Sequence, residues 1–331
     1  MKFYDGNKFF IEGIIESSSQ RENTYDRLPK VYKNTLRKEL WDLSKNSSGV
    51  AIKFMTDSKS INIKWVLINN MSMNHMPNTG IKGVDLYSKS DDIWEYVNTG
   101  IPEGIKNEQV LLKNSKKKLR EYVLYLPLYE GTKNIQIGID DNSKIKSQKK
   151  RGNSFVFYGT SLTQGGCASR PGLSYTNIIS RKMKQECINL GFSGNGHLDE
   201  SIAEILSSIT PKAFIIECMA NLDVDMVKNR MINFIKKIRE KNLSTPIIFI
   251  EECFNRNNLN EDFRNSIIKK NKELFNQFQK MKNENINGLY IINDNNILNS
   301  ESTVDGVHFN DLGSVRYANY FINEIKKLNI F

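Results

Sequence analysis

Short runs in which apolar and polar residues alternate dominate the first 140 positions of the chain. They lie between clusters of Gly, Asn, Asp and Ser, and they include residues 50–54, 61–67, 84–87, 119–126 and 134–139. Alternation with a period of two, bounded by turn-forming residues, is typical of strands that bury one face. The pattern predicts an antiparallel β-sandwich over residues 1–140, and we expect the residues before Val50 to enter this sandwich by loops and a strand.

The pattern changes near residue 150. Residues 141–152 are polar and basic and have no periodicity, which predicts a linker. Beyond them, apolar runs alternate with longer segments of helical spacing, such as 226–241 and 260–282; the runs are 154–158, 187–190, 213–216, 247–250 and 289–292. Buried strands that alternate with helices predict a three-layer α/β domain with a parallel five-stranded sheet over residues 153–331.

The charge of the chain raises the question of an acidic partner. A chain of 331 residues is long enough for two domains, and its net charge of +10 comes largely from Lys- and Arg-rich clusters at 113–120 and 144–151. Such clusters occur in nucleic-acid contacts and also in solvated loops. Because the sequence has no recognisable nucleic-acid module, we interpret them as a loop and a linker and expect no nucleic-acid partner.

The apolar runs are too short to cross a membrane. Residues 246–250 form one of the longest, whereas a membrane-spanning helix needs ~20 apolar residues. The first residues show neither the apolar core nor the cleavage site of a signal peptide. We therefore expect no membrane association and a cytoplasmic location, and the oligomeric state stays open.

Cysteine and histidine usage bears on cofactors. The four cysteines form no CxxC pair and mostly adjoin apolar segments, which favours small buried thiols. The three histidines lack the spacing of metal ligands. We expect neither a protein metal site nor a cofactor.

Two motifs suggest nucleophilic chemistry. Residues 159–166 read Gly-Thr-Ser-Leu-Thr-Gln-Gly-Gly and place Ser161 at a strand-to-helix turn, at the edge of the sheet where ligands bind. Near the C-terminus, Asp305 and His308 stand three residues apart on one predicted loop. A hydroxyl nucleophile needs a base, and the base needs an acceptor on its other nitrogen. Taken alone, each motif is also compatible with an ordinary turn.

Two further motifs could supply an oxyanion hole. Gly194 lies in a glycine-rich segment after the second strand, and Asn221 follows the third strand. Backbone N–H groups and amide donors at such positions can stabilise a developing oxyanion. Turn geometry would explain Gly194, and helix capping would explain Asn221. Four such features in this order at the ends of strands favour a catalytic site.

The order Gly-x-Ser, Gly, Asn and Asp-x-x-His resembles the four blocks of the SGNH (GDSL-like) hydrolases. The resemblance covers residues 153–331 and implies that Ser161 is the nucleophile, with Asp305 and His308 as acid and base. It also implies that the oxyanion hole is formed by the backbone N–H groups of Ser161 and Gly194 and by the side-chain amide of Asn221. Thr160 replaces the Asp of the usual Gly-Asp-Ser motif, which is not the triad acid in the family.

A further resemblance is to the subgroup of SGNH proteins with an N-terminal β-domain. The segment Gly83-Val-Asp-Leu-Tyr87 is similar to the Gly-x-Asp-Leu-Tyr signature of that domain, and residues 73–80 also fit. The two-domain plan is similar to that of carbohydrate esterases that place a jelly roll before the hydrolase. Arg170 and His75 are candidate substrate-binding residues, although a salt bridge at the surface or domain interface explains Arg170 equally well, and a structural role is favoured for His75.

These features together predict a serine esterase that acts on short O-acyl groups, such as acetyl, of a carbohydrate or another small polar molecule. The same triad would serve an acyltransferase or a peptide or thioester hydrolase, because acceptor choice lies in the pocket. An inactive glycan-binding protein is the alternative from another class, and the intact set of site residues argues against it.

Overall fold

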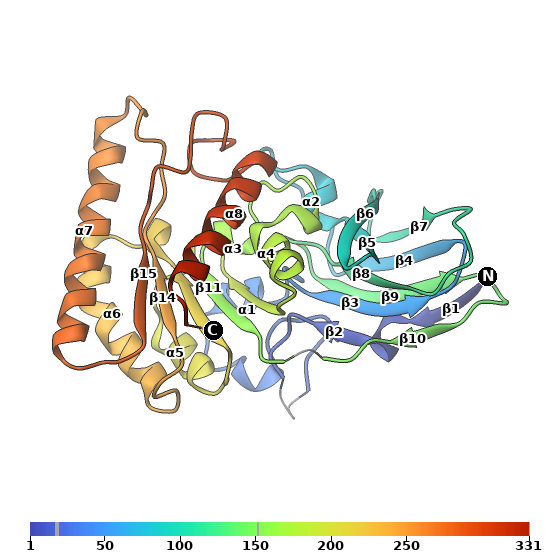
Figure 1. The fold of residues 1–331 in the computed structure, drawn as a ribbon, viewed down its shortest axis with the longest axis horizontal. Coiled ribbons are helices and arrows are strands. Elements are labelled where there is room, and N and C mark those ends of the chain that lie inside the picture. Colours follow the sequence, from blue (N-terminus) through green and yellow to red (C-terminus); the bar gives the residue numbers. More distant parts are fainter. Residues whose placement is uncertain (17–19, 151, 331) are drawn as a thin grey trace.

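The computed structural model describes residues 1–16, 20–150 and 152–330 and contains a β-sandwich beside a helix-covered parallel sheet (Figure 1). The sandwich is built of two antiparallel sheets. One has the order β1-β9-β4-β7, and the other has the order β10-β3-β8-β5-β6 with β2 paired to β3. The first sheet comprises β1 (Lys2–Asp5), β4 (Ile61–Leu67), β7 (Lys106–Leu112) and β9 (Thr132–Ile139). The second comprises β2 (Phe10–Glu12), β3 (Ala51–Thr56), β5 (Val84–Ser90), β6 (Ile93–Gly100), β8 (Arg120–Tyr125) and β10 (Ile145–Ser147).

The alternating runs of the sequence become the inner faces of these two sheets. Ile61, Ile63 and Trp65 of β4 are fully buried and pack against Ile52 and Phe54 of β3 in one core. Strands β3, β4, β5, β8 and β9 coincide with the predicted runs, which confirms the sandwich. Strands β6 and β7 were not predicted, because much of their side-chain surface is exposed and their alternation is weak.

The parallel sheet has the order β12-β11-β13-β14-β15. All five predicted strands are present, and neighbouring strands pair in parallel. They are β11 (Phe155–Gly159), β12 (Cys187–Gly191), β13 (Ala213–Glu217), β14 (Ile247–Ile250) and β15 (Leu289–Ile292). The order places β11, which leads to Ser161, between β12 and β13.

Helices cover both faces of this sheet. One face packs against α5 (Glu200–Ser207), α6 (Val224–Arg239) and α7 (Glu261–Asn283), and the other packs against α4 (Tyr175–Met183) and α8 (Asp311–Lys327) (Figure 1). Strand β11 is apolar throughout because both of its faces are buried. Val156 and Tyr158 pack in the core on the α5–α7 side, whereas Phe155 and Phe157 pack in the core on the α4 and α8 side. The three-layer α/β prediction is confirmed.

Short helical elements lie in the connections between the strands and the longer helices. The 3-10 turns are η1 (Gly6–Lys8), η2 (Lys30–Tyr32), η3 (Pro171–Leu173) and η4 (Met219–Asn221), and the short helices are α1 (Lys38–Leu43), α2 (Asn78–Lys82) and α3 (Ser161–Gln164).

The course of the chain before Val50 differs from the expectation. Strands β1 and β2 do join the sandwich, but Ile15, Leu28, Leu40 and Trp41 pack in the α5–α7 core of the α/β domain. The reason is hydrophobic burial: α1 presents Leu40 and Trp41 to that core, where Leu40 is fully buried. The segment therefore belongs to both domains.

The predicted linker at 141–152 is only partly a connector. Within it, β10 pairs antiparallel with β3, so three of its residues extend the second sheet of the sandwich. A short, polar strand at a sheet edge leaves no alternating apolar face, so its sequence resembles a linker.

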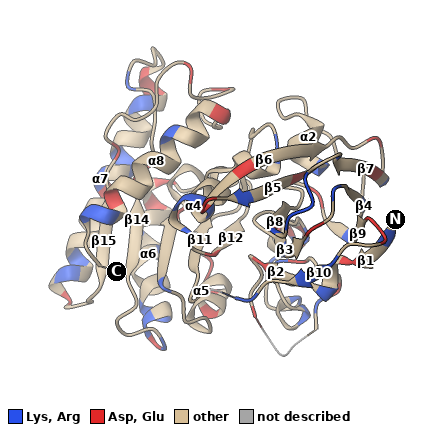
Figure 2. Ribbon diagram, turned by 45° about the vertical axis from the view of Figure 1, so that its right-hand side comes forward, with Lys and Arg blue, Asp and Glu red and all other residues tan. Residues whose placement is uncertain are grey.

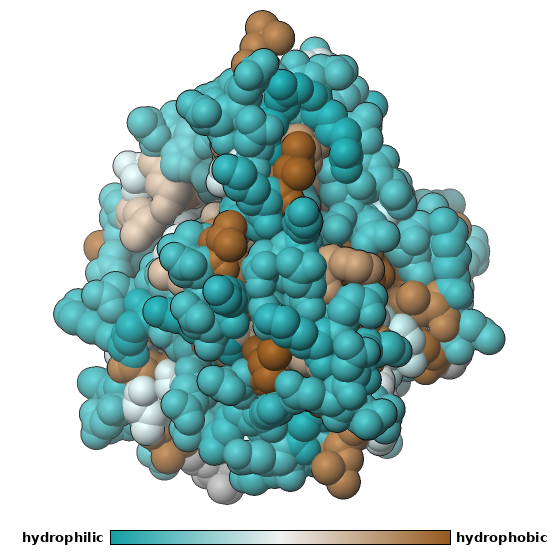
Figure 3. All heavy atoms as spheres, turned by 90° about the vertical axis from the view of Figure 1, so that its left-hand side faces the viewer, coloured by the Kyte–Doolittle hydropathy of each residue, from teal (hydrophilic) through white to brown (hydrophobic). Residues whose placement is uncertain are grey.

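Basic and acidic residues lie on both domains in the view of Figure 2. Figure 3 shows the face formed by α6 and α7, on which apolar side chains are isolated among hydrophilic ones. In the part of the chain that the structure describes, no helix combines the length and apolarity needed to traverse a bilayer.

Candidate active site

Ser161 lies at the sharp turn between β11 and α3. Thr160 caps the short helix, since its hydroxyl accepts a hydrogen bond from the backbone N–H of Leu162 at 3.2 Å. Gly159 permits this turn, because a Cβ there would lie 2.2 Å from the Thr163 hydroxyl and 2.6 Å from the carbonyl oxygen of Glu217. The serine side chain is thereby held at the carboxyl end of β11.

The structure brings Ser161, His308 and Asp305 into one hydrogen-bonded chain. His308 Nε2 lies 2.9 Å from Ser161 Oγ, and His308 Nδ1 lies 2.7 Å from Asp305 Oδ2. A carboxylate at Nδ1 assigns the proton to that nitrogen, so the lone pair of Nε2 faces the serine hydroxyl. This is the arrangement that a general base needs in order to remove the serine proton.

The loop that carries Asp305 and His308 is internally braced. Asp305 Oδ1 accepts the backbone N–H groups of Val307 and His308 at 3.0 and 2.8 Å. Burial by itself would raise the pKa of Asp305, but the hydrogen bonds from His308 and Val307 lower it below its usual value. Asp305 therefore stays ionised at neutral pH and can stabilise a protonated His308.

The candidate oxyanion donors lie on the loops that follow the strands beside β11. Gly194, after β12, has a φ of +66°, which favours glycine, and a Cβ there would meet no atom within 4 Å. Asn221 ends η4 after β13, and its Oδ1 accepts the backbone N–H of Gly196 at 3.1 Å. Because that bond uses the amide oxygen, the Nδ2 donor is directed away from Gly196.

Two arginines from the N-terminal segment contact β12 and the Gly194 loop that follows it, and the sequence interpretation missed them. Arg27 is fully buried and donates from Nη1 to the carbonyl oxygens of Asn189 and Gly191 at 3.1 and 2.7 Å. Burial lowers its pKa to about 9. Arg37 donates to Asn195 at 3.0 Å and to Asp199 at 2.9 Å. Both arginines lie far along the chain from the residues that they contact, so no local motif would have indicated this role.

Glu217 lies beneath the nucleophile turn and is the second group that was missed. Its Oε2 accepts hydrogen bonds from the hydroxyls of Thr160 and Thr163 at 3.0 and 2.7 Å. Burial raises its pKa to about 7, and the hydrogen bonds from the two threonines oppose the rise. Thr160, which stands where the family usually has Asp, thus supplies a donor to a buried carboxyl group. A carboxylate at this position would face Glu217 instead.

His75 comes from the β-sandwich and reaches the catalytic loop. Its ring centroid lies 5.6 Å from that of His308. The loop that carries it is braced by Glu130, which accepts the N–H groups of Asn69 and Met71 at 3.2 and 3.0 Å. His75 is exposed, so it stands where a substrate group can meet it, and its substrate-binding role stays a prediction.

Arg170 forms hydrogen bonds across the interface between the two domains. Its Nη1 donates to Asp85 Oδ2 and to the Tyr87 hydroxyl, both at 2.7 Å, and the Asp85 side chain is fully buried. These contacts are with β5 of the sandwich, within the Gly-Val-Asp-Leu-Tyr motif. They favour the domain-interface role over the substrate-binding one.

Comparison with known proteins agrees with this arrangement. Residues 152–326, more than half of the chain, match the model of the GDSL-like lipase/acylhydrolase family, and residues 1–145 match the N-terminal domain (GxDLY) of SGNH-hydrolase-type esterases. The chain belongs to the GDSL-like lipase/acylhydrolase family. Membership makes it a serine ester hydrolase, and the second match confirms the predicted subgroup.

Several solved structures resemble this GDSL-like hydrolase over nearly their whole length. A Bacteroides ovatus protein described as a GDSL-like lipase is 32% identical, with a TM-score of 0.94 over 98% of this chain and 97% of that one. The salicylyl-acyltransferase SsfX3 of a tetracycline biosynthetic pathway shares the fold at 13% identity, with a TM-score of 0.81 over 100% and 98% of the chains. An acetyl xylan esterase from the rumen bacterium Butyrivibrio proteoclasticus has 10% identity and a TM-score of 0.59 over 100% of both chains. No curated protein matches the chain.

Proposed function

We propose that this chain hydrolyses short O-acyl esters, such as acetyl esters, of a carbohydrate or another small polar molecule through a Ser161–His308–Asp305 triad. The observation that carries the proposal is the hydrogen-bonded chain from Ser161 Oγ through both nitrogens of His308 to Asp305, with distances of 2.9 and 2.7 Å. The likeness to an acetyl xylan esterase supports the acyl group and substrate class, through the fold alone.

The proposed reaction begins when His308 Nε2 takes the proton of Ser161 as Oγ attacks the ester carbonyl. Asp305 stabilises the imidazolium that forms, and the backbone N–H groups of Ser161 and Gly194, with the Asn221 amide, stabilise the oxyanion. His308 then gives its proton to the leaving alcohol. Water, activated by the same imidazole, releases the acid from the acyl-enzyme and restores Ser161.

The first test is hydrolysis of p-nitrophenyl acetate and butyrate by the wild type and by Ser161→Ala. We expect turnover of the acetyl ester by the wild type and its loss in the variant, together with labelling of Ser161 by a fluorophosphonate probe. O-acetylated sugars then serve as substrates, with release of acetate as the readout. Inactivity on every ester, with no label on Ser161, would refute the proposal.

The same experiment separates hydrolysis from acyl transfer, which uses the same acyl-enzyme. A sugar or an amine is added as acceptor, and the acylated acceptor is quantified against the released acid. Hydrolysis in excess supports the proposal, whereas transfer in excess assigns the chain to acyl transfer.

A further inference from the structure

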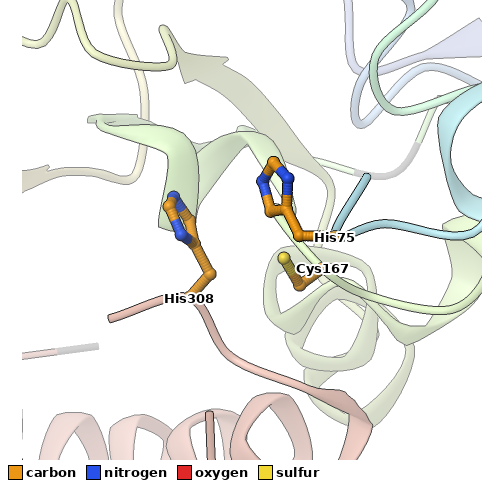
Figure 4. A group of neighbouring side chains, drawn as sticks. All are labelled: His75, Cys167 and His308. Carbon is orange, nitrogen blue, oxygen red and sulfur yellow. The ribbon is translucent and has the colours of Figure 1, made fainter. Parts of the chain in front are cut away.

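Three side chains that can bind a metal ion meet beside the proposed triad. His75 comes from the loop before α2, Cys167 follows α3, and His308 belongs to the C-terminal catalytic loop. One ligand atom from each lies within 4.8 Å of the other two, the one such group of three among the described residues. Figure 4 shows the Cys167 sulfur directed toward the two imidazole rings.

We propose that His75, Cys167 and His308 form a binding site for one divalent transition-metal ion of the Zn²⁺ type, and that its occupancy reversibly inhibits the enzyme. The sequence interpretation expected no metal site, because it considered ligand spacing along the chain. These three ligands come from separate segments and two domains, so only tertiary contacts bring them together.

The hydrogen bonds of the two imidazoles leave the correct nitrogens for an ion. His308 Nδ1 lies 2.7 Å from Asp305 Oδ2, and His75 Nδ1 lies 2.9 Å from the side-chain oxygen of Asn74. In each ring the Nδ1–H group therefore donates, and Nε2 retains its lone pair. Metal-binding histidines in proteins usually have such an oxygen partner on the other nitrogen, which orients the ring.

The donor set selects the class of ion. Two imidazoles and one thiolate suit Zn²⁺, Co²⁺ or Cu²⁺, whereas Mg²⁺ and Ca²⁺ prefer oxygen ligands. Three protein ligands leave a fourth position for water or for Ser161 Oγ. When the ion binds, the Cys167 thiol releases its proton to solvent and coordinates as a thiolate.

Binding of an ion requires the three ligand atoms, which lie within 4.8 Å of one another, to move slightly closer together. Tetrahedral Zn²⁺ with bonds of about 2.1 Å to nitrogen and 2.3 Å to sulfur places its ligand atoms roughly 3.5 Å apart. The exposed His75 side chain has room to close this gap. Cys167 is held in place: it is 4% exposed, has a φ of +66° and packs with Met76 and Tyr129.

Inhibition follows from competition for one atom. His308 Nε2 lies 2.9 Å from Ser161 Oγ, and an ion bound to Nε2 takes the lone pair that would accept the serine proton. The inhibitory effect rests on the proposed triad, whereas binding of the ion does not. The two claims are therefore tested by different readouts.

The test uses the full chain without an affinity tag, freed of metal by a chelator. Co²⁺ is added and the thiolate-to-metal absorption band is followed, and the Kd for Zn²⁺ is measured by competition against a metal indicator. We expect one ion per chain. Cys167→Ala and His75→Ala should each weaken binding at least tenfold, since even outer-sphere partners of a metal ligand are worth 10–100-fold.

Matched controls are Cys253→Ala and His197→Ala, which remove a cysteine and a histidine outside the group and should leave the Kd unchanged. Mg²⁺ and Ca²⁺ should neither bind nor inhibit. In the esterase assay, Zn²⁺ should inhibit the wild type and a chelator should restore the rate. Cys167→Ala should keep the uninhibited rate and need at least tenfold more Zn²⁺.

Wild-type binding equal to that of Cys167→Ala and His75→Ala, or the absence of a thiolate band, would overturn the site. An active esterase that Zn²⁺ does not inhibit, although the ion binds, would overturn the inhibition. If the chain cleaves no ester but binds Zn²⁺ in the expected variant-dependent way, the metal site stands and the proposed function fails.

Discussion

At the residue scale, the two polar atoms of the Asn221 side-chain amide have different roles. Its oxygen accepts the backbone N–H of Gly196 at 3.1 Å, which orients the side chain, and its Nδ2 is the proposed oxyanion donor. Orientation and donation can be separated by substitution, because aspartate retains the acceptor and lacks the donor.

We predict that Asn221→Ala lowers kcat by roughly 10²–10³, the usual effect of losing one oxyanion-hole donor, with little change in KM. Asn221→Asp should lose at least as much, because the donor is absent and a negative charge faces the oxyanion. The measurement is steady-state hydrolysis of p-nitrophenyl acetate. An aspartate variant with wild-type turnover would show that only the orienting bond matters.

At the scale of elements, the nucleophile turn is held from below by β13. Glu217, at the end of that strand, accepts hydrogen bonds from both threonines that flank Ser161 in α3 and its cap. Burial raises its pKa to about 7, whereas a glutamate in the unfolded chain titrates near 4.5. The folded protein therefore holds this proton more tightly than the unfolded chain does.

It follows that ionisation of Glu217 lowers the free energy of unfolding as pH rises from about 4.5 to 7, by at most about 3 kcal/mol. We predict that Glu217→Gln, which mimics the protonated side chain, loses less stability than the wild type between pH 5 and pH 8. Urea unfolding at both pH values measures this difference, and any constant cost of the substitution cancels.

The control for that measurement is the exposed residue Glu204, for which Glu204→Gln should show the wild-type pH dependence. Glu186, whose pKa burial also raises to about 7, is present in all three proteins and does not affect the comparison. An identical loss of stability in the wild type and Glu217→Gln would contradict the prediction.

At the scale of the whole molecule, the Arg170–Asp85 pair joins the two domains. Asp85 Oδ2 also accepts the backbone N–H of Gly172 at 2.8 Å, so one buried carboxylate ties β5 to the segment after the nucleophile helix. Removing the cation would leave that carboxylate buried without its charge partner.

We predict that Arg170→Ala lowers the free energy of unfolding by about 3 kcal/mol and leaves KM close to the wild-type value at a temperature where the variant is folded. Arg170→Lys should lose less stability, because the charge remains. Urea unfolding and ester hydrolysis are the measurements. A raised KM with unchanged stability would instead support substrate binding by Arg170.

The segment before Val50 is a second connection between the domains. Leu40 is fully buried against the α5–α7 side of the parallel sheet, although it is far from that domain in the sequence. We predict that Leu40→Ala costs about 2–5 kcal/mol of stability, as expected for a buried leucine. Leu243→Ala, at a position that is 78% exposed, is the control and should have almost no effect in the same unfolding measurement.

The sequence alone determined the β-sandwich and α/β fold classes, all five parallel strands and the family, because these depend on local periodicity and on short motifs. Burial on both faces makes β11 to β15 continuous apolar runs, and the motifs around Ser161, Gly194, Asn221 and His308 lie next to strand ends. Strands with exposed faces, such as β6, leave no such pattern and were missed.

Only the tertiary structure decided the contacts between distant segments. Three contacts each join parts of the chain that no local pattern connects: Arg27 at the end of β12, Glu217 under the nucleophile turn, and His75 beside Cys167 and His308. Local periodicity reports which face of an element is buried, but it carries no information on which remote residue it is buried against. That pairing is set by the packing of the whole chain. The residues that support the proposed active site are brought to it by such contacts between distant segments.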